Sequence, residues 1–279
     1  MSGTPSGFRR QRVGPRVVVV TTPLEGAARE LGLLEPGGIE RLLASGVDGA
    51  VGAGRASNAV VRLPGSEERL HLRPFRHGGP LAGVLGDRLP GLGRPLAELA
   101  ANTRLAAAGA PVPHPALVAG RRRGPGMWTA AVGTLHVENA CGAGELLSKR
   151  LEPERLLPLA AAAGTALRRF HDAGGRHADL HVGNLLIREA GPAPRVLIVD
   201  LDRVRVASPV PARRRMAEIM RLYRSLVKRR MSGALAPGVI AHFLDGYTAG
   251  DAGLRDALLA HLPCERLRLA IHRLGYQRG

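Results

Sequence analysis

Cysteine and aromatic residues are scarce in this chain. Cys141 and Cys264 are the only cysteines among 279 residues, and they form no close-spaced motif. A disulfide-stapled scaffold is therefore not expected, and a reducing compartment fits the composition. Aromatic residues make up 3% of the chain. Because base stacking on aromatic rings is a main source of single-strand binding, we expect no nucleic acid partner.

Long apolar segments are also absent from the sequence. No run approaches the roughly 18–20 residues that a membrane-spanning helix needs. The run Val17–Val20 ends at Thr21, which makes it too short for the apolar region of a secretory signal. We therefore expect a cytoplasmic protein, with peripheral contact to the inner face of the cytoplasmic membrane.

Basic residues, in contrast, far outnumber acidic ones. The chain carries 40 Lys and Arg against 23 Asp and Glu, a net charge of +17. Such a surplus attracts polyanions through its long-range field. Because aromatic residues are few, an anionic membrane face or a phosphate-bearing substrate is favoured over nucleic acid. The 45% hydrophobic content is typical of a globular protein.

The sequence pattern divides the chain into a tail and two lobes. Residues 1–15 are rich in Gly, Ser, Pro and Arg and predict a flexible tail. Residues 16–136 predict an N-lobe with a small antiparallel sheet and one main helix, Pro95–Ala108. Residues 137–279 predict a larger, mostly helical C-lobe.

The expected strands are Val17–Val20, Asn58–Leu63, Arg69–Phe75, Ala116–Ala119, Trp128–Val137, Leu185–Arg188 and Val196–Val199. The expected C-lobe helices are Pro153–Ala173, 212–230, 237–248, 252–261 and 264–275. A sheet-rich lobe followed by a helical lobe predicts an α+β, two-lobed, protein-kinase-like fold.

The most informative segment runs from His177 to Ile187 and is followed by a strand that ends at Asp200. Asp179 lies in a loop after the long helix, and Asn184 follows five residues later. Phosphoryl transfer needs one carboxylate that orients the attacking hydroxyl and accepts its proton. It also needs an amide and a second carboxylate that hold Mg²⁺ against the phosphates. The ordered set predicts Asp179 as the catalytic base and Asn184 and Asp200 as metal ligands, although each residue alone would fit a polar loop.

Three histidines offer a competing interpretation of the same segment. His171, His177 and His181 lie within eleven residues and could bind zinc. This hypothesis is the weaker one. His171 sits near the end of a helix, and His177 falls where kinase-like catalytic loops carry a structural histidine.

The stretch Phe170–Ile187 resembles the catalytic loop of bacterial lipopolysaccharide core kinases, in particular the 3-deoxy-D-manno-octulosonic acid (Kdo) kinase family. Leu197–Arg203 resembles that family's metal-binding segment, where Asp-x-Asp-Arg replaces the Asp-Phe-Gly of protein kinases. The resemblance spans roughly residues 50–230. It implies a kinase-like fold, ATP as phosphoryl donor and Mg²⁺ as cofactor, with supporting roles for His177 and Asp202.

Residues earlier in the chain fit the nucleotide side of such a kinase. Gly52 and Gly54 precede a strand pair, where a phosphate-covering turn belongs, because backbone N–H groups approach phosphate closely where side chains are absent. Arg73 lies where protein kinases place a phosphate-contacting Lys, and Arg can make that contact bidentately. The family's spacing implies Glu98 as its partner. The alternative for Glu98 is a solvated helix residue.

The segment Ala212–Met231 predicts a strongly basic helix. It carries eight cations and one acid beside an apolar stripe at helical spacing. A core-packed helix with a solvated face explains the stripe, whereas the cations suit an anionic lipid surface or a phosphate-bearing acceptor. Arg221 and Arg224 are the expected acceptor or membrane contacts, because they fall within the family-like segment.

These observations predict an ATP-dependent kinase that phosphorylates a sugar hydroxyl, of Kdo or heptose, in an anionic glycolipid of the lipopolysaccharide inner core. A kinase for another acceptor, such as an aminoglycoside or a protein, shares the same polar core. A cationic aminoglycoside, however, matches a basic enzyme poorly. A non-catalytic kinase-like binding module is the second alternative. The three core polar residues argue against it, and Arg73 and the atypical glycine turn keep it open.

Overall fold

The computed structural model describes residues 5–45, 58–76, 87–149 and 151–265. The chain forms two compact units. The first, called the sheet unit below, comprises Met1–Ala106 and Pro113–Glu138. The second, called the helical unit, comprises Ala107–Val112 and Asn139–Gly279.

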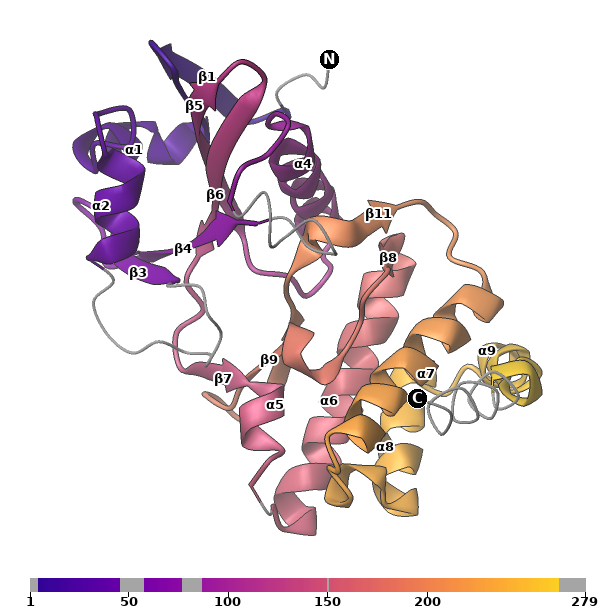
Figure 1. Cartoon of the computed structure of the whole chain (residues 1–279). Helices are drawn as coiled ribbons and strands as arrows, with labels where there is room; N and C mark the ends of the chain where they lie inside the picture. Colours follow the sequence, from indigo (N-terminus) through magenta and orange to yellow (C-terminus); the bar gives the residue numbers. More distant parts are fainter. Residues whose placement is uncertain (1–4, 46–57, 77–86, 150, 266–279) are drawn as a thin grey trace, which may run out of the picture. The chain divides into compact units, whose positions relative to one another are not determined.

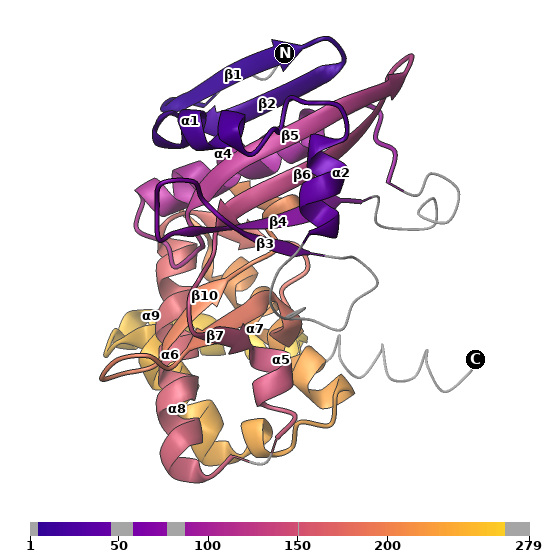
Figure 2. The ribbon, with the colours of Figure 1, turned by 90° about the vertical axis from the view of Figure 1, so that its left-hand side faces the viewer.

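The sheet unit is built on one antiparallel sheet of six strands in the order β1-β2-β5-β6-β4-β3. Figure 2 shows the strands in this order, from β1 at the top downwards. In chain order they are β1 (Phe8–Val13), β2 (Arg16–Thr21), β3 (Ala59–Arg62), β4 (Arg69–Phe75), β5 (Pro115–Gly124) and β6 (Met127–Leu135). The hairpin expected between residues 58 and 75 is confirmed as β3 and β4.

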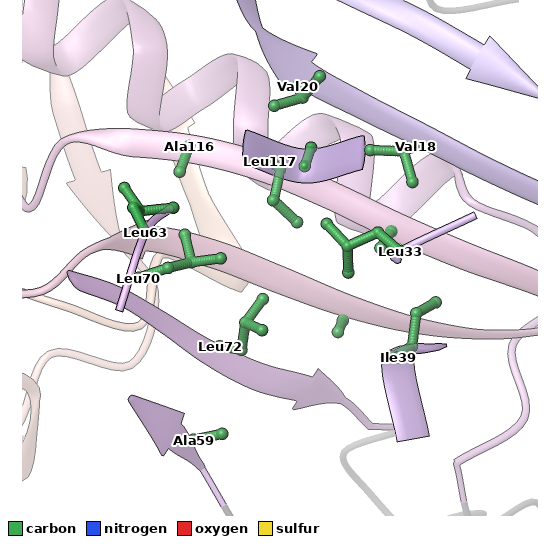
Figure 3. Close-up of a cluster of buried hydrophobic side chains, with 13 residues drawn as sticks. Val18, Val20, Leu33, Ile39, Ala59, Leu63, Leu70, Leu72, Ala116 and Leu117 are labelled. Atoms are coloured by element: carbon green, nitrogen blue, oxygen red, sulfur yellow. The ribbon is translucent and has the colours of Figure 1, made fainter. Parts of the chain in front are cut away.

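Helices cover both faces of this sheet. Figure 1 shows α1 and α2 on one face and α4 on the other. Val18 and Val20 of β2 belong to the core shown in Figure 3, which includes residues of α1 and α2. Val17 and Val19 belong to the core on the α4 side. A strand covered on both faces is apolar throughout, which explains the run Val17–Val20. The helical elements are η1 (Thr22–Leu24), α1 (Glu25–Glu30), α2 (Gly38–Ala44) and α4 (Gly93–Ala107).

Residues 1–15, predicted as a flexible tail, instead contain strand β1. β1 pairs with β2 across a two-residue turn at Gly14-Pro15. Gly14 has a φ of 54°, in the left-handed region that glycine adopts at little cost. The exposed arginines of β1 lie at the edge of the sheet, where charged side chains discourage pairing with other chains. Such an edge strand has the composition of a loop, which is why the prediction was wrong.

The helical unit contains five helices with defined bounds and two small sheets among its described residues, and residues 262–265 are also helical. The helices are α5 (Ala143–Leu146), α6 (Pro153–Asp172), α7 (Ala212–Lys228), α8 (Pro237–Thr248) and α9 (Ala252–Leu259), with 3-10 turns η2 (Val182–Asn184), η3 (Leu201–Arg203) and η4 (Gly233–Leu235). The strands are β7 (Ala140–Gly142), β9 (Leu185–Arg188) and β10 (Arg195–Ile198) in one sheet, and β8 (Gly175–His177) paired with β11 (Val204–Val206).

The helices expected between residues 153 and 261 are thus confirmed. The helix expected at 264–275 lies almost entirely outside the described residues. Within the described part of the chain, no helix combines the length and apolarity that crossing a bilayer requires.

Two glycines allow α6 and α8 to approach closely. A Cβ on Gly164 would lie 2.0 Å from the carbonyl oxygen of Phe243. A Cβ on Gly246 would lie 2.2 Å from the carbonyl oxygen of Ala161. Any larger side chain would force the two backbones apart, so glycine is required at both positions. This contact fixes α6, whose C-terminal end leads into the loop described below.

An apolar cavity of about 340 Å³ lies in the helical unit. Leu156, Ala163, Met220 and Phe243, from α6, α7 and α8, are among the side chains that line it.

We predict that Gly246→Ala lowers the free energy of unfolding by about 2–3 kcal/mol, because the added methyl group overpacks the contact between α6 and α8. Gly238→Ala on the same helix is the matched control, since no atom lies within 4 Å of its Cβ position. The control should leave stability unchanged or raise it by up to about 1 kcal/mol. Urea unfolding followed by circular dichroism measures both. Equal stability of the two variants would contradict the close helix contact.

Candidate active site

The predicted catalytic and metal-binding residues lie in the helical unit, in the loop between β8 and β9 and in the turn after β10. After α6 the chain passes through Gly174, whose φ of 85° is in the left-handed region, and enters β8. β8 pairs antiparallel with β11, with His177 opposite Val204. This pairing brings the start of the loop beside the segment that follows β10.

His177 joins the loop to the end of β10. Its side chain is buried, and its Nδ1 atom accepts a hydrogen bond of 3.3 Å from the backbone N–H of Asp179. Because Nδ1 accepts, the proton of the neutral ring sits on Nε2, which donates to the carbonyl oxygen of Val199 at 3.3 Å. His177 thus supports the backbone on both sides of the site.

Asn184 ties the end of the loop to Asp179. Its Nδ2 atom donates a hydrogen bond of 2.9 Å to the carbonyl oxygen of Asp179, and the side chain is buried. The N–H of Val199 donates a hydrogen bond of 2.9 Å to the carbonyl oxygen of Asn184. The side chain of Asp179 itself is exposed. Backbone contacts therefore bring Asp179, Asn184 and the residue before Asp200 into one hydrogen-bonded assembly.

Asp200 adopts a left-handed backbone conformation, with φ 59° and ψ 66°. This region costs a non-glycine residue roughly 1–3 kcal/mol, although Asp and Asn tolerate it better than most residues. Observed strain of this kind is concentrated at functional sites. The conformation turns the chain sharply after β10 and leaves the Asp200 side chain exposed.

A buried polar cluster supports the start of the loop. The Oε2 atom of Glu218, on α7, accepts a hydrogen bond of 2.9 Å from the backbone N–H of His177. The same oxygen lies 3.2 Å from Nε2 of His171, at the end of α6. The Nδ1 atom of His171 lies 2.6 Å from the hydroxyl of Tyr247, on α8. The cluster therefore connects three helices to the loop.

The electrostatics of these groups are set by burial. Burial lowers the pKa of His171 and of His177, against hydrogen bonds to Glu218 and to the Val199 carbonyl that raise them. Burial also raises the pKa of Tyr247, so its hydroxyl keeps its proton and donates to His171. Both ring nitrogens of His171 and of His177 are engaged with protein groups, which argues against the zinc hypothesis.

Asn184 and Asp200 offer oxygen ligands of the kind that Mg²⁺ prefers. Because Nδ2 of Asn184 is bonded to Asp179, its Oδ1 atom points away from that bond. The carboxylate of Asp200 is solvent-exposed. In the described part of the chain, no three His, Cys, Asp or Glu side chains form a metal cluster. The donor set fits Mg²⁺, which commonly takes one or two protein ligands and completes its shell with water and phosphate oxygens.

In the sheet unit, Arg73 on β4 and Glu98 on α4 form an ion pair. One Nη2 atom of Arg73 lies 2.5 Å and 2.6 Å from the two carboxylate oxygens of Glu98. Glu98 is 6% exposed, so it is not a solvated helix residue. A role in nucleotide binding stays a prediction. Gly52 and Gly54 lie outside the described residues.

The remaining predicted residues also belong to the helical unit. Asp202 is in η3, directly after Asp200 and Leu201. Arg221 donates a hydrogen bond of 3.1 Å to the carbonyl oxygen of His177. Arg224 lies 3.9 Å from Glu265. The suggested acceptor and membrane contacts of the two arginines stay predictions.

Sequence reasoning missed two residues that contact the loop, Glu218 and Ser225. Both lie on α7, and the Ser225 hydroxyl accepts a hydrogen bond of 2.9 Å from the N–H of Val182. The available signal was their spacing around Arg221, which places all three on one face of the helix.

Known proteins resemble this chain in sequence and in fold. The model of the lipopolysaccharide kinase (Kdo/WaaP) family matches residues 65–247. Two curated relatives are named 3-deoxy-D-manno-octulosonic acid kinase, from Xanthomonas euvesicatoria pv. vesicatoria (strain 85-10) and Xanthomonas axonopodis pv. citri (strain 306). Each is 32% identical to this chain over 173 residues, covering 57% of this chain and 62% of the relative's length.

A solved structure described as WaaP in complex with acyl carrier protein shares the fold. Its TM-score is 0.53 at 18% identity, over 89% of this chain and 98% of that chain. This likeness confirms the predicted protein-kinase-like fold.

We predict that acid destabilises the protein through His71, a partly buried histidine. Burial, with the charges of His136 and Arg73, lowers the pKa of His71 on β4 to about 4. The unfolded state takes up the proton near pH 6.5. The free energy of unfolding should therefore be constant above about pH 7 and fall as the pH drops below about 6.5 towards 4.

The variant His71→Gln isolates the contribution of one histidine. Between pH 7 and pH 5 the free energy of unfolding of this variant should fall by about 2 kcal/mol less than that of wild type, because the variant lacks the lowered pKa of His71. Urea unfolding at several pH values measures the difference. Parallel pH profiles for wild type and variant would show that His71 does not titrate as its burial requires.

Proposed function

This chain belongs to the lipopolysaccharide kinase (Kdo/WaaP) family, and we propose that it transfers the γ-phosphoryl group of ATP to a sugar hydroxyl of the lipopolysaccharide inner core. The observation that carries the proposal is the hydrogen-bonded assembly of Asp179, Asn184 and the segment leading to Asp200. The curated relatives are named as Kdo kinases, which favours Kdo over heptose as the acceptor.

Asp179 is the proposed catalytic base. Its backbone is held at N–H and carbonyl by His177 and Asn184, while its carboxylate is exposed to an incoming substrate. It would orient the acceptor hydroxyl and accept its proton as the oxygen attacks the γ-phosphorus. The bond to the ADP leaving group breaks in the same displacement. Fixing a carboxylate through its own backbone limits its freedom without occupying its oxygens, which suits this role.

Asn184 and Asp200 are the proposed ligands of Mg²⁺, which when bound neutralises charge on the donor phosphates. Asn184 contributes a neutral oxygen from a side chain that is already fixed by Asp179. Asp200 contributes a charged oxygen from a backbone held in one unusual conformation. In the sheet unit, Arg73, oriented by Glu98, is proposed to contact the donor phosphates.

The net charge of +17 suits an acceptor that carries phosphates or carboxylates. We propose that the protein meets such a glycolipid at the inner face of the cytoplasmic membrane. Arg213 and Arg214 on α7 are exposed and suited to that contact. Arg215 is not, because it donates hydrogen bonds to Asp172 and to the carbonyl oxygen of Val210.

We predict that Asp179→Asn lowers the rate of phosphate transfer from ATP to a Kdo-containing lipid A acceptor by about 10²- to 10⁴-fold, because a positioned base is lost. The melting temperature and the affinity for Mg-ATP should stay close to wild type, since Asp179 is held through backbone atoms that the substitution keeps. Transfer, thermal melting and nucleotide binding are measured on one preparation.

Glu189→Gln is the control, because it removes an exposed carboxylate that pairs with Arg155, outside the proposed site. It should transfer phosphate at the wild-type rate. If the Asp179→Asn protein folds normally and transfers phosphate at the wild-type rate, Asp179 is not the catalytic base. Transfer to an aminoglycoside or a protein, and not to the glycolipid, would favour the alternative kinase function.

We predict that the double variant Arg213→Gln, Arg214→Gln binds anionic liposomes about 10- to 30-fold more weakly than wild type at low salt. Each basic residue near such a surface contributes about 1 kcal/mol. The difference should shrink as salt rises, because screening shortens the reach of the field. Sedimentation with phosphatidylglycerol vesicles measures it.

The matched control is Arg9→Gln, Arg10→Gln, which removes the same charge from two exposed positions of β1. Equal weakening by both double variants would mean that net charge, and not α7, governs membrane binding.

A further inference from the structure

One face of α7 contacts the backbone of the loop that carries Asp179. Glu218, Arg221 and Ser225 are spaced i, i+3 and i+7, so they share this face. Glu218 accepts from the N–H of His177 at 2.9 Å, and Arg221 donates to the carbonyl oxygen of the same residue at 3.1 Å. Ser225 accepts from the N–H of Val182 at 2.9 Å.

These three contacts bracket the proposed catalytic base. His177 is held through both of its backbone polar groups, and Val182 is held five residues later. Asp179 lies between the two anchors. All three contacts are made to main-chain atoms, so they fix the path of the loop whatever side chains it carries.

The hydroxyl of Ser225 is itself fixed. It donates a hydrogen bond of 2.7 Å to the carbonyl oxygen of Leu222, one turn earlier on α7. This bond holds the Ser225 side chain in the rotamer whose oxygen accepts from the N–H of Val182. Ser148 makes the same kind of bond, at 2.6 Å to the carbonyl oxygen of Glu145. Within the described residues, no backbone N–H donates to the hydroxyl of Ser148.

Apolar side chains supply other contacts of α7. Met216, Ile219, Met220 and Leu222 of α7 line the apolar cavity of about 340 Å³. Apolar packing is non-directional. The directional hydrogen bonds to the loop therefore set the register between helix and loop.

We infer that α7 is a positioning element for the proposed catalytic base, acting through Glu218, Arg221 and Ser225 on the backbone at His177 and Val182. The inference rests on the proposed function for its catalytic consequence. The contact between helix and loop can be tested without any reaction. None of the three side chains needs to touch substrate.

The first experiment measures hydrogen exchange of the Val182 amide in the full chain without nucleotide. Ser225→Ala should accelerate this exchange by about 3- to 10-fold, the effect of losing one hydrogen bond. Ser225→Thr, which restores a hydroxyl, should return it towards wild type. Ser148→Ala should leave it unchanged. Unchanged exchange in Ser225→Ala would overturn the inference.

The second experiment measures steady-state phosphate transfer from Mg-ATP to the Kdo-containing lipid A acceptor. Arg221→Met should lower kcat by about 10- to 100-fold, since a small displacement of a reacting group has effects of this size. KM for ATP should stay near wild type, because the loop anchor and not the nucleotide site is changed. Arg221→Lys, which keeps a cationic donor, should recover most of kcat.

The two experiments separate failure of the inference from failure of the proposed function. A lower melting temperature with normal kcat for the folded fraction would make Arg221 merely structural and overturn the positioning role. Faster exchange of the Val182 amide together with an unchanged kcat in Ser225→Ala would also overturn the positioning role. If wild type transfers no phosphate to any acceptor, the proposed function fails, and the exchange experiment alone decides whether α7 holds the loop.

Discussion

The buried carboxylate of Glu218 is the contact on which the site depends. One of its oxygens serves both the backbone N–H of His177 and the ring of His171. A carboxylate removed from water is costly unless hydrogen bonds replace its hydration. The protein supplies those bonds from α6 and from the loop. The requirement to satisfy this one group therefore fixes the relation among α6, α7 and the start of the loop.

From this anchor a chain of hydrogen bonds, most of them between a side chain and the backbone, leads to Asp179, to Asn184 and to the residue before Asp200. The ring of His177 is hydrogen-bonded to the carbonyl oxygen of Val199 and to the N–H of Asp179. The side chain of Asn184 donates to the carbonyl oxygen of Asp179, and the N–H of Val199 donates to the carbonyl oxygen of Asn184. The side chains of Asp179 and Asp200 stay exposed at the ends of this chain. A rigid backbone with exposed acidic groups is the arrangement that preorganised phosphoryl transfer requires.

The sequence predicted the parts of this site that depend on local order. Asp179, Asn184 and Asp200 follow each other at a spacing from which their proposed roles were predicted, and the pairing of Arg73 with Glu98 followed from the family resemblance. Glu218 and Ser225 escaped prediction because their partners lie about forty residues away in sequence; their spacing around Arg221 places them on one helix face but does not say which loop that face contacts. Strand β1 escaped because an exposed edge strand has the composition of a loop. The four valines of β2 did carry a signal for a sheet covered on both faces.

The most direct measurement is the fate of the labelled γ-phosphate of ATP when the purified full chain meets a panel of lipid-linked core sugars. We expect Mg²⁺-dependent appearance of the label as a phosphomonoester on the sugar of a Kdo-containing glycolipid, identified by mass spectrometry after separation. Release of the label only as inorganic phosphate, or no consumption of ATP with any sugar of the panel, would contradict this expectation.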